Sequence, residues 1–102
     1  MARSPLHPGE VLLEEFMKPR GVTAYALASR CGIPRARLER IVREKASVNA
    51  DTALRLAKFF GTTPEYWLNL QARYELETTA SEIRKELAAI KTREPVRRNL
   101  RP

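Results

Sequence analysis

The stretch Ala28-Ser29-Arg30-Cys31-Gly32-Ile33-Pro34-Arg35-Ala36-Arg37-Leu38-Glu39-Arg40-Ile41 decides the fold of this chain. A short helical segment ends at Gly32, because glycine permits the left-handed backbone of a helix C-terminus. A second segment starts at Pro34, with arginines on one side and aliphatic residues on the other. Small Ala28, four residues before Gly32, lets the two helices approach closely at a steep angle. The pattern predicts a helix-turn-helix whose second helix, residues 34–43, lies against nucleic acid.

The outer face of helix 34–43 carries the candidate DNA-binding residues. Arg35 and Arg37 lie near its N-terminal end, which points toward base edges in such motifs. Arginine can bond guanine O6 and N7 together. Arg43 and Lys45 come at the end of the helix and suit phosphates. The alternative is an ordinary solvated helix, in which Glu39 pairs with its arginine neighbours.

The charge distribution agrees with a polyanionic partner. The chain has 102 residues and a net charge of +7, from 19 basic and 12 acidic residues. Residues 23–45 carry six basic and two acidic groups, and residues 80–102 carry seven and three. The excess therefore gathers in the reading helix and in the C-terminal tail. A solvated basic face is the plainer interpretation.

Length and residue types favour one small cytoplasmic domain that is not an enzyme. The single cysteine, Cys31, forms no intrachain disulfide and suits a reducing compartment as a structural thiol. We find no apolar run of membrane-spanning length and no signal peptide. The only histidine, His7, flanks a helix start more readily than it performs chemistry. We therefore predict no catalytic residues, no metal and no cofactor.

The hydrophobic periodicity predicts an all-α fold of five helices with a C-terminal helical extension. The first helix opens at His7 and stops at Lys18, because Pro19 disfavours helix at the preceding residue. The second opens at Thr23, and the third is the reading helix. Asn49 or Asp51 caps the fourth, and we expect its inner face to contain Ala53, Leu54, Leu56, Ala57 and Phe60.

The fifth helix is predicted to begin at Thr63, because a capping hydroxyl there precedes a proline at the first helical position. The spacing of Thr79 and Glu82 is that of a capping box and favours a break near Thr78. Whether the helix is continuous through residues 78–81 stays open. A restarted helix would carry Ile83, Leu87 and Ile90 on one side. We predict a DNA-binding domain over 1–76, a helical extension over 77–91 and a flexible basic tail over 92–102.

Residues 23–45 resemble the Xre/lambda-repressor-like helix-turn-helix family. The opening His7-Pro8-Gly9-Glu10 and the segment 50–74, which contains Thr63-Pro64-Glu65-Tyr66-Trp67-Leu68-Asn69-Leu70-Gln71, narrow the resemblance to HigA antitoxins of type II toxin–antitoxin modules. The resemblance implies a dimeric autorepressor that binds an inverted repeat in its own operon. It also implies a partner HigB/RelE-type toxin, a ribosome-dependent mRNA endonuclease. A solitary regulator with the same fold is the alternative.

The resemblance also assigns residues to the interface. It places Arg35, Ala36 and Arg40 at base-contacting positions, next to Arg37. Ala24 replaces the glutamine that often touches phosphate, so that contact is either absent or supplied by Tyr25. The turn after the reading helix lacks the usual glycine and has Glu44 instead, which puts its conformation in question. The predicted DNA-binding residues are Thr23, Tyr25, Arg35, Ala36, Arg37, Arg40, Arg43 and Lys45.

Two further segments have competing interpretations. Trp67, Leu70, Gln71 and Tyr74 form an aromatic-rich stripe, which is either a dimer seam or, especially for Trp67 and Leu70, core packing. The tail over 92–102 is a phosphate-contacting arm, part of a toxin-binding surface or merely a charged end.

Overall fold

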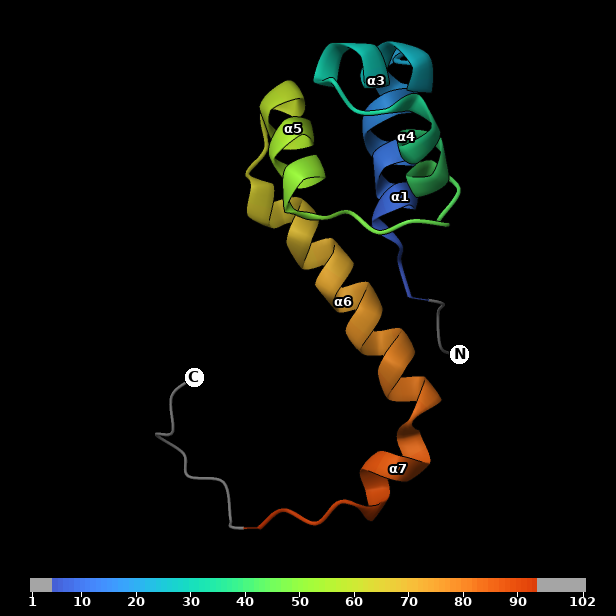
Figure 1. Cartoon of the computed structure of the whole chain (residues 1–102), viewed down its shortest axis with the longest axis vertical. Helices are drawn as coiled ribbons and strands as arrows, with labels where there is room; N and C mark the ends of the chain where they lie inside the picture. Colours follow the sequence, from blue (N-terminus) through green and yellow to red (C-terminus); the bar gives the residue numbers. More distant parts are fainter. Residues whose placement is uncertain (1–4, 94–102) are drawn as a thin grey trace.

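The structure is a computed structural model that describes residues 5–93, and every regular element in that range is helical (Figure 1). The elements are α1 (Pro8–Val11), the π-helical segment η1 (Leu12–Met17), α2 (Lys18–Arg20), α3 (Ala24–Cys31), α4 (Arg35–Val42), α5 (Ala50–Phe60), α6 (Pro64–Glu82) and α7 (Arg84–Ala89). The first three follow one another without a gap and make up the first expected helix. The predicted all-α class is confirmed. Within residues 5–93, none of the helices has the length and hydropathy of a membrane span.

The first helical run, residues 8–20, extends further than predicted. The expected stop at Lys18 is wrong, because the helix continues through Pro19 to Arg20 and turns at Gly21 (φ 64°). Proline leaves the carbonyl four residues earlier without its usual N–H partner. That carbonyl, on Glu15, accepts a hydrogen bond from the Arg20 guanidinium at 3.2 Å. The Arg20 side chain therefore compensates for the proline, after the wider turn of η1.

Helices α3, α5 and α6 begin at the predicted caps. The side-chain oxygens of Thr23, Asn49 and Thr63 each accept a hydrogen bond from the N–H three residues later, at 3.1, 2.9 and 3.2 Å. Asn49 rather than Asp51 caps α5. These bonds satisfy backbone donors that a helix N-terminus otherwise leaves free.

The core lies between the first helical run, α3, α4, α5 and the start of α6. Its fully buried members include Leu12, Leu27, Leu38, Ile41, Leu56 and Trp67. One expected core residue is not there: Leu54 is 58% exposed. The buried face of α5 consists of Thr52, Ala53, Leu56 and Ala57. At 100° per residue, Leu54 falls beyond the edge of that stripe.

The C-terminal helices leave the core, and α7 lies at the end of the molecule opposite to α3 and α4 (Figure 1). The expected break near Thr78 is absent, since α6 continues to Glu82 and the chain turns at Ile83. The Thr78 hydroxyl donates to the carbonyls of Tyr74 (2.9 Å) and Glu75 (3.2 Å). It is thus satisfied within α6.

Candidate nucleic-acid interface

The turn between α3 and α4 has the predicted geometry. Gly32 adopts a left-handed backbone (φ 69°), and the N–H of Ile33 donates to the Ala28 carbonyl at 3.0 Å. Ala28 is buried, so the helices pack closely at this point. Ile33 is buried beside it and fills the space that the turn encloses. Backbone geometry and packing therefore fix the angle between the two helices.

α4 presents an arginine-rich surface because its other side is fixed in the core. Leu38 and Ile41 are completely buried, which sets the rotation of the helix about its own axis. Glu39 is half-buried beside the exposed residues. We call the exposed set the arginine face, and its members are Arg35, Ala36, Arg37, Arg40 and Arg43. The predicted residues of the reading helix are therefore all exposed to solvent.

Arg35 is held on two sides within the arginine face. Its Nε donates to Glu39 Oε2 at 2.8 Å. Its guanidinium carbon lies 5.2 Å from the centre of the Tyr25 ring. Tyr25, at the start of α3, is 65% exposed, and the Thr23 hydroxyl oxygen caps the same helix. The sequence indicated these residues separately, whereas their contact depends on the packing of α3 against α4.

The turn after α4 adopts a left-handed conformation without glycine. Glu44 has φ 64°, and the N–H of Lys45 donates to the Arg40 carbonyl at 2.7 Å. The Arg40 guanidinium donates in return to the Lys45 carbonyl at 3.4 Å. The loop therefore has the shape that glycine would give it, and Arg40 is partly engaged in holding it.

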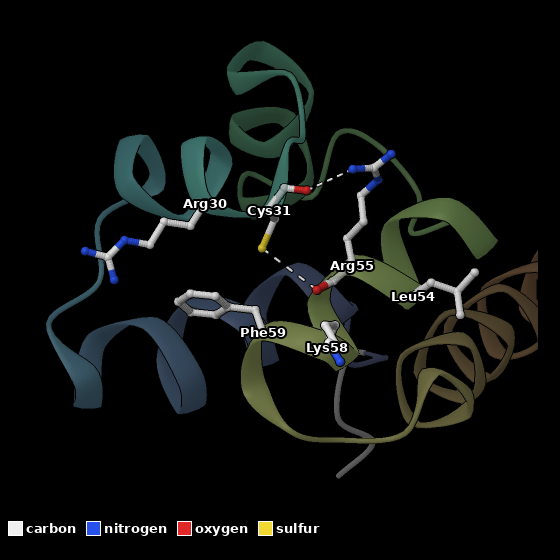
Figure 2. Close-up of a pocket in the computed structure, with 6 residues that line it drawn as sticks. All are labelled: Arg30, Cys31, Leu54, Arg55, Lys58 and Phe59. Carbon is white, nitrogen blue, oxygen red and sulfur yellow. Dashed lines mark hydrogen bonds between the residues drawn. The ribbon is translucent and has the colours of Figure 1, made fainter.

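Arg55 is a residue of this region that the sequence reasoning missed. Its Nε donates to Asp51 Oδ1 at 2.7 Å. Its Nη1 donates to the carbonyl of Cys31 at 2.9 Å (Figure 2). A longer bond of 3.4 Å reaches the Gly32 carbonyl. Arg55 thus connects α5 to the helix-turn-helix and satisfies carbonyls at the end of α3. The available signal was the four-residue spacing of Asp51 and Arg55.

Beside Arg55 lies a shallow hollow between α3 and α5 (Figure 2). Its lining residues are Arg30, Cys31, Leu54, Arg55, Lys58 and Phe59. The Cys31 thiol donates to the Arg55 carbonyl at 3.9 Å. Burial raises the pKa of this thiol, so it stays protonated at neutral pH. The surroundings of Cys31 are those of a structural thiol.

The stripe on α6 is largely engaged within the monomer. Trp67 is completely buried, and its Nε1 donates to the Thr62 hydroxyl at 2.8 Å. Gln71 is buried too, and its Oε1 accepts from the Val48 N–H at 2.8 Å. Leu70 is half-buried against the core. Core packing, one of the two interpretations that the sequence left open, accounts for Trp67. The hydrogen bond of Gln71 holds the loop before α5 against α6.

His7 is a capping residue. Its Nδ1 accepts from the Gly9 N–H at 2.8 Å, and its ring lies edge-on to Tyr74 with centroids 4.7 Å apart. Burial lowers the pKa of His7, while the charge of Glu44 opposes that shift. A Cβ on Gly9 would lie 1.9 Å from the Ile41 carbonyl oxygen, so α1 packs directly on α4.

Within residues 5–93 no group of three or more His, Cys, Asp or Glu side chains could hold a metal ion.

The C-terminal helices expose apolar side chains beyond the stripe. These are Leu76 (71% exposed), Ile83 (37%), Leu87 (46%) and Ile90 (68%), which we call the extension face. The predicted tail over 92–102 lies mostly outside the described residues, which end at Arg93.

Comparison with known proteins agrees with this geometry. A family model described as Helix-turn-helix matches residues 13–67, and this family is one of DNA-binding regulators. Virulence-associated protein I of Dichelobacter nodosus is 47% identical over 72 residues, which are 71% of this chain and 67% of that protein.

Two solved structures superimpose over most of the chain. One is the Pseudomonas aeruginosa antitoxin HigA with higBA promoter (TM-score 0.85, 34% identity, 88% of this chain and 99% of that chain). The other is the antitoxin GraA in complex with its operator (TM-score 0.84, 41% identity, 94% and 97%).

Proposed function

The chain belongs to the helix-turn-helix family of HigA-type antitoxins, and from this membership we propose that it represses its own operon and neutralises a partner toxin. In this proposal a homodimer binds an inverted repeat upstream of the operon. The toxin is a HigB/RelE-type mRNA endonuclease encoded beside it. The protein itself is a binding protein and performs no catalysis.

The observation that carries the DNA-binding part is the arginine face on a rigidly seated helix. Leu38 and Ile41 fix α4 in the core, and the arginines of the helix are exposed to solvent. Specific DNA recognition requires side chains held in one register against base edges. The same fold in HigA and GraA has been solved with promoter or operator DNA, which supports the same use here.

The test is a binding titration of the full chain on DNA from upstream of its own operon. We expect the operator to bind at least about a thousandfold more tightly than scrambled DNA of the same length at physiological salt. Glu14→Gln serves as the control, because it alters an exposed ion pair with Lys18 on the first helical run, outside the arginine face. Equal affinity for operator and scrambled DNA would contradict the repressor function.

The dimer and the toxin have a test of their own. A two-fold dimer would place its two α4 helices about 34 Å apart, one turn of DNA. The exposed part of Tyr74 and the extension face are the surfaces that we propose for these contacts. Sedimentation at micromolar concentration should give a dimer, and co-expression of the neighbouring reading frame should yield a complex. A regulator that lacks any toxin-sized neighbour would instead be solitary.

The predicted basic tail binds DNA phosphates in this proposal. Deletion of residues 92–102 should then reduce the salt dependence of DNA binding by about one unit of slope for each phosphate that the tail neutralises. An unchanged slope with weakened toxin binding would place the tail at the toxin instead.

A further inference from the structure

We propose that Arg35 reads one guanine in each operator half-site, and that Tyr25 and Glu39 are positioning residues for it. This inference rests on the proposed repressor function. It assigns the base-reading role to one member of the arginine face, through contacts that exist before DNA is bound.

The argument starts from which nitrogens of Arg35 are occupied. Its Nε donates to Glu39 Oε2 at 2.8 Å, so the carboxylate takes the side of the guanidinium. The Tyr25 ring lies 5.2 Å from the guanidinium carbon and limits movement out of that plane. The side chain is 60% exposed, and among the described residues its two terminal nitrogens have no hydrogen-bond acceptor, so they stay available as a planar fork. Such a fork matches the O6 and N7 acceptors of guanine.

Arg40 has a different environment on the same helix. Its terminal nitrogen donates to the Lys45 carbonyl at 3.4 Å, in the turn where Glu44 is left-handed. Reading a base with that fork would require giving up this bond. Arg35 is therefore the better-prepared base reader, and Arg40 suits backbone positioning.

Glu39 gives the proposal a distinctive signature. A carboxylate near DNA phosphates opposes binding to any sequence, because like charges repel. Replacing it by glutamine should strengthen non-specific binding and at the same time weaken discrimination at the guanine. A residue that served only the stability of α4 would not produce these opposite effects.

The experiment uses the full chain and operator duplexes in which each guanine of a half-site is replaced in turn by 7-deazaguanine, which lacks the N7 acceptor. For the unaltered protein we expect one position to lose about threefold to tenfold in affinity, part of the discrimination of a paired arginine–guanine contact. The Arg35→Ala variant should bind the unmodified operator and the duplex with 7-deazaguanine at that position equally. Arg35→Lys should keep its affinity for scrambled DNA and show a smaller 7-deazaguanine penalty, since an ammonium lacks the rigid fork.

The positioning residues are tested by the ratio of the affinities for the guanine duplex and the 7-deazaguanine duplex. Glu39→Gln and Tyr25→Leu should each lower the penalty at that guanine about twofold, as exposed ion pairs and cation–π contacts contribute modestly. Tyr25→Phe keeps the ring and should keep the full penalty. The control Glu14→Gln makes the same chemical change in the exposed pair with Lys18 and should leave the ratio unchanged.

The outcomes separate the two levels of the proposal. A 7-deazaguanine penalty that persists in Arg35→Ala would overturn the role of Arg35. A penalty unaffected by Glu39→Gln and Tyr25→Leu would overturn their positioning roles. Failure of the unaltered protein to prefer its operator over scrambled DNA would overturn the repressor function itself, and this inference with it.

Discussion

The turn after α4 offers a prediction about stability, because a glutamate occupies a position that glycine fills elsewhere in the chain. Four helix ends close with an N–H bonded to the carbonyl five residues earlier; the donors are Val22, Ile33, Lys45 and Thr62. Each donor follows a residue with positive φ, namely Gly21, Gly32, Glu44 and Gly61. This is the Schellman arrangement, in which the left-handed position favours glycine. Glu44 is the exception among these four ends.

The expected increase in the free energy of unfolding on Glu44→Gly follows from two opposing contributions. A side chain in the left-handed region costs roughly 1–2 kcal/mol. Glycine has more freedom in the unfolded chain, which costs about 0.5–1 kcal/mol on folding. Glu44→Ala is the matched reference, because it removes the charge near His7 and keeps the Cβ. We expect the glycine variant to exceed the alanine variant by about 0.5–1 kcal/mol in free energy of unfolding.

The assay is urea denaturation of both variants at one protein concentration, since dimerisation would make stability depend on concentration. In a thermal scan the difference corresponds to about 3–6 °C in Tm for a domain of this size. Asparagine tolerates the left-handed region and should fall between the two. A glycine variant no more stable than the alanine variant would refute the strained turn at Glu44.

Three further predictions concern the core, the histidine cap and the connection between α5 and α3. Trp67→Ala should lower the free energy of unfolding by about 3–5 kcal/mol, against at most about 0.5 kcal/mol for the exposed Tyr25→Ala in the same urea titration. Burial lowers the pKa of His7, so its contribution to stability is complete above the unfolded pKa of about 6.5 and is lost as the pH falls from there toward the folded pKa. His7→Asn keeps a capping side chain and should show a weaker loss between pH 7 and 5; an identical slope would count against this explanation. Arg55→Met removes the hydrogen bonds to the carbonyls at the end of α3 and should lower the free energy of unfolding by about 0.5–1.5 kcal/mol. An unchanged free energy of unfolding would show that water replaces these bonds fully.

Local sequence signals predicted most of the helical architecture correctly. Thr23, Asn49 and Thr63 cap helices as expected, and Gly32 makes the predicted turn. These features depend on residues within one helical turn of each other. All the groups that take part in them are therefore visible in a short window of sequence.

The wrong predictions arose where a more distant or competing partner decided the outcome. Pro19 does not stop its helix at Lys18, because the Arg20 side chain satisfies the carbonyl that the proline leaves free. The capping-box spacing of Thr79 and Glu82 starts no helix, because α6 runs without a break to Glu82. At Pro19 the spacing alone did not say whether a neighbouring side chain would replace the missing N–H donor.

The sequence by itself determined that this chain is an all-α protein with a helix-turn-helix and an outward set of arginines, because periodicity, caps and charge are local properties. Only the tertiary structure decided how those arginines differ. Packing of α3 on α4 brings Tyr25 to Arg35, and the closed turn brings the Lys45 carbonyl to Arg40. Arg55 reaches across from α5 to the end of α3. The physical reason is that a side chain's free donors depend on which neighbours have already accepted its hydrogen bonds, and those neighbours are set by how the helices pack.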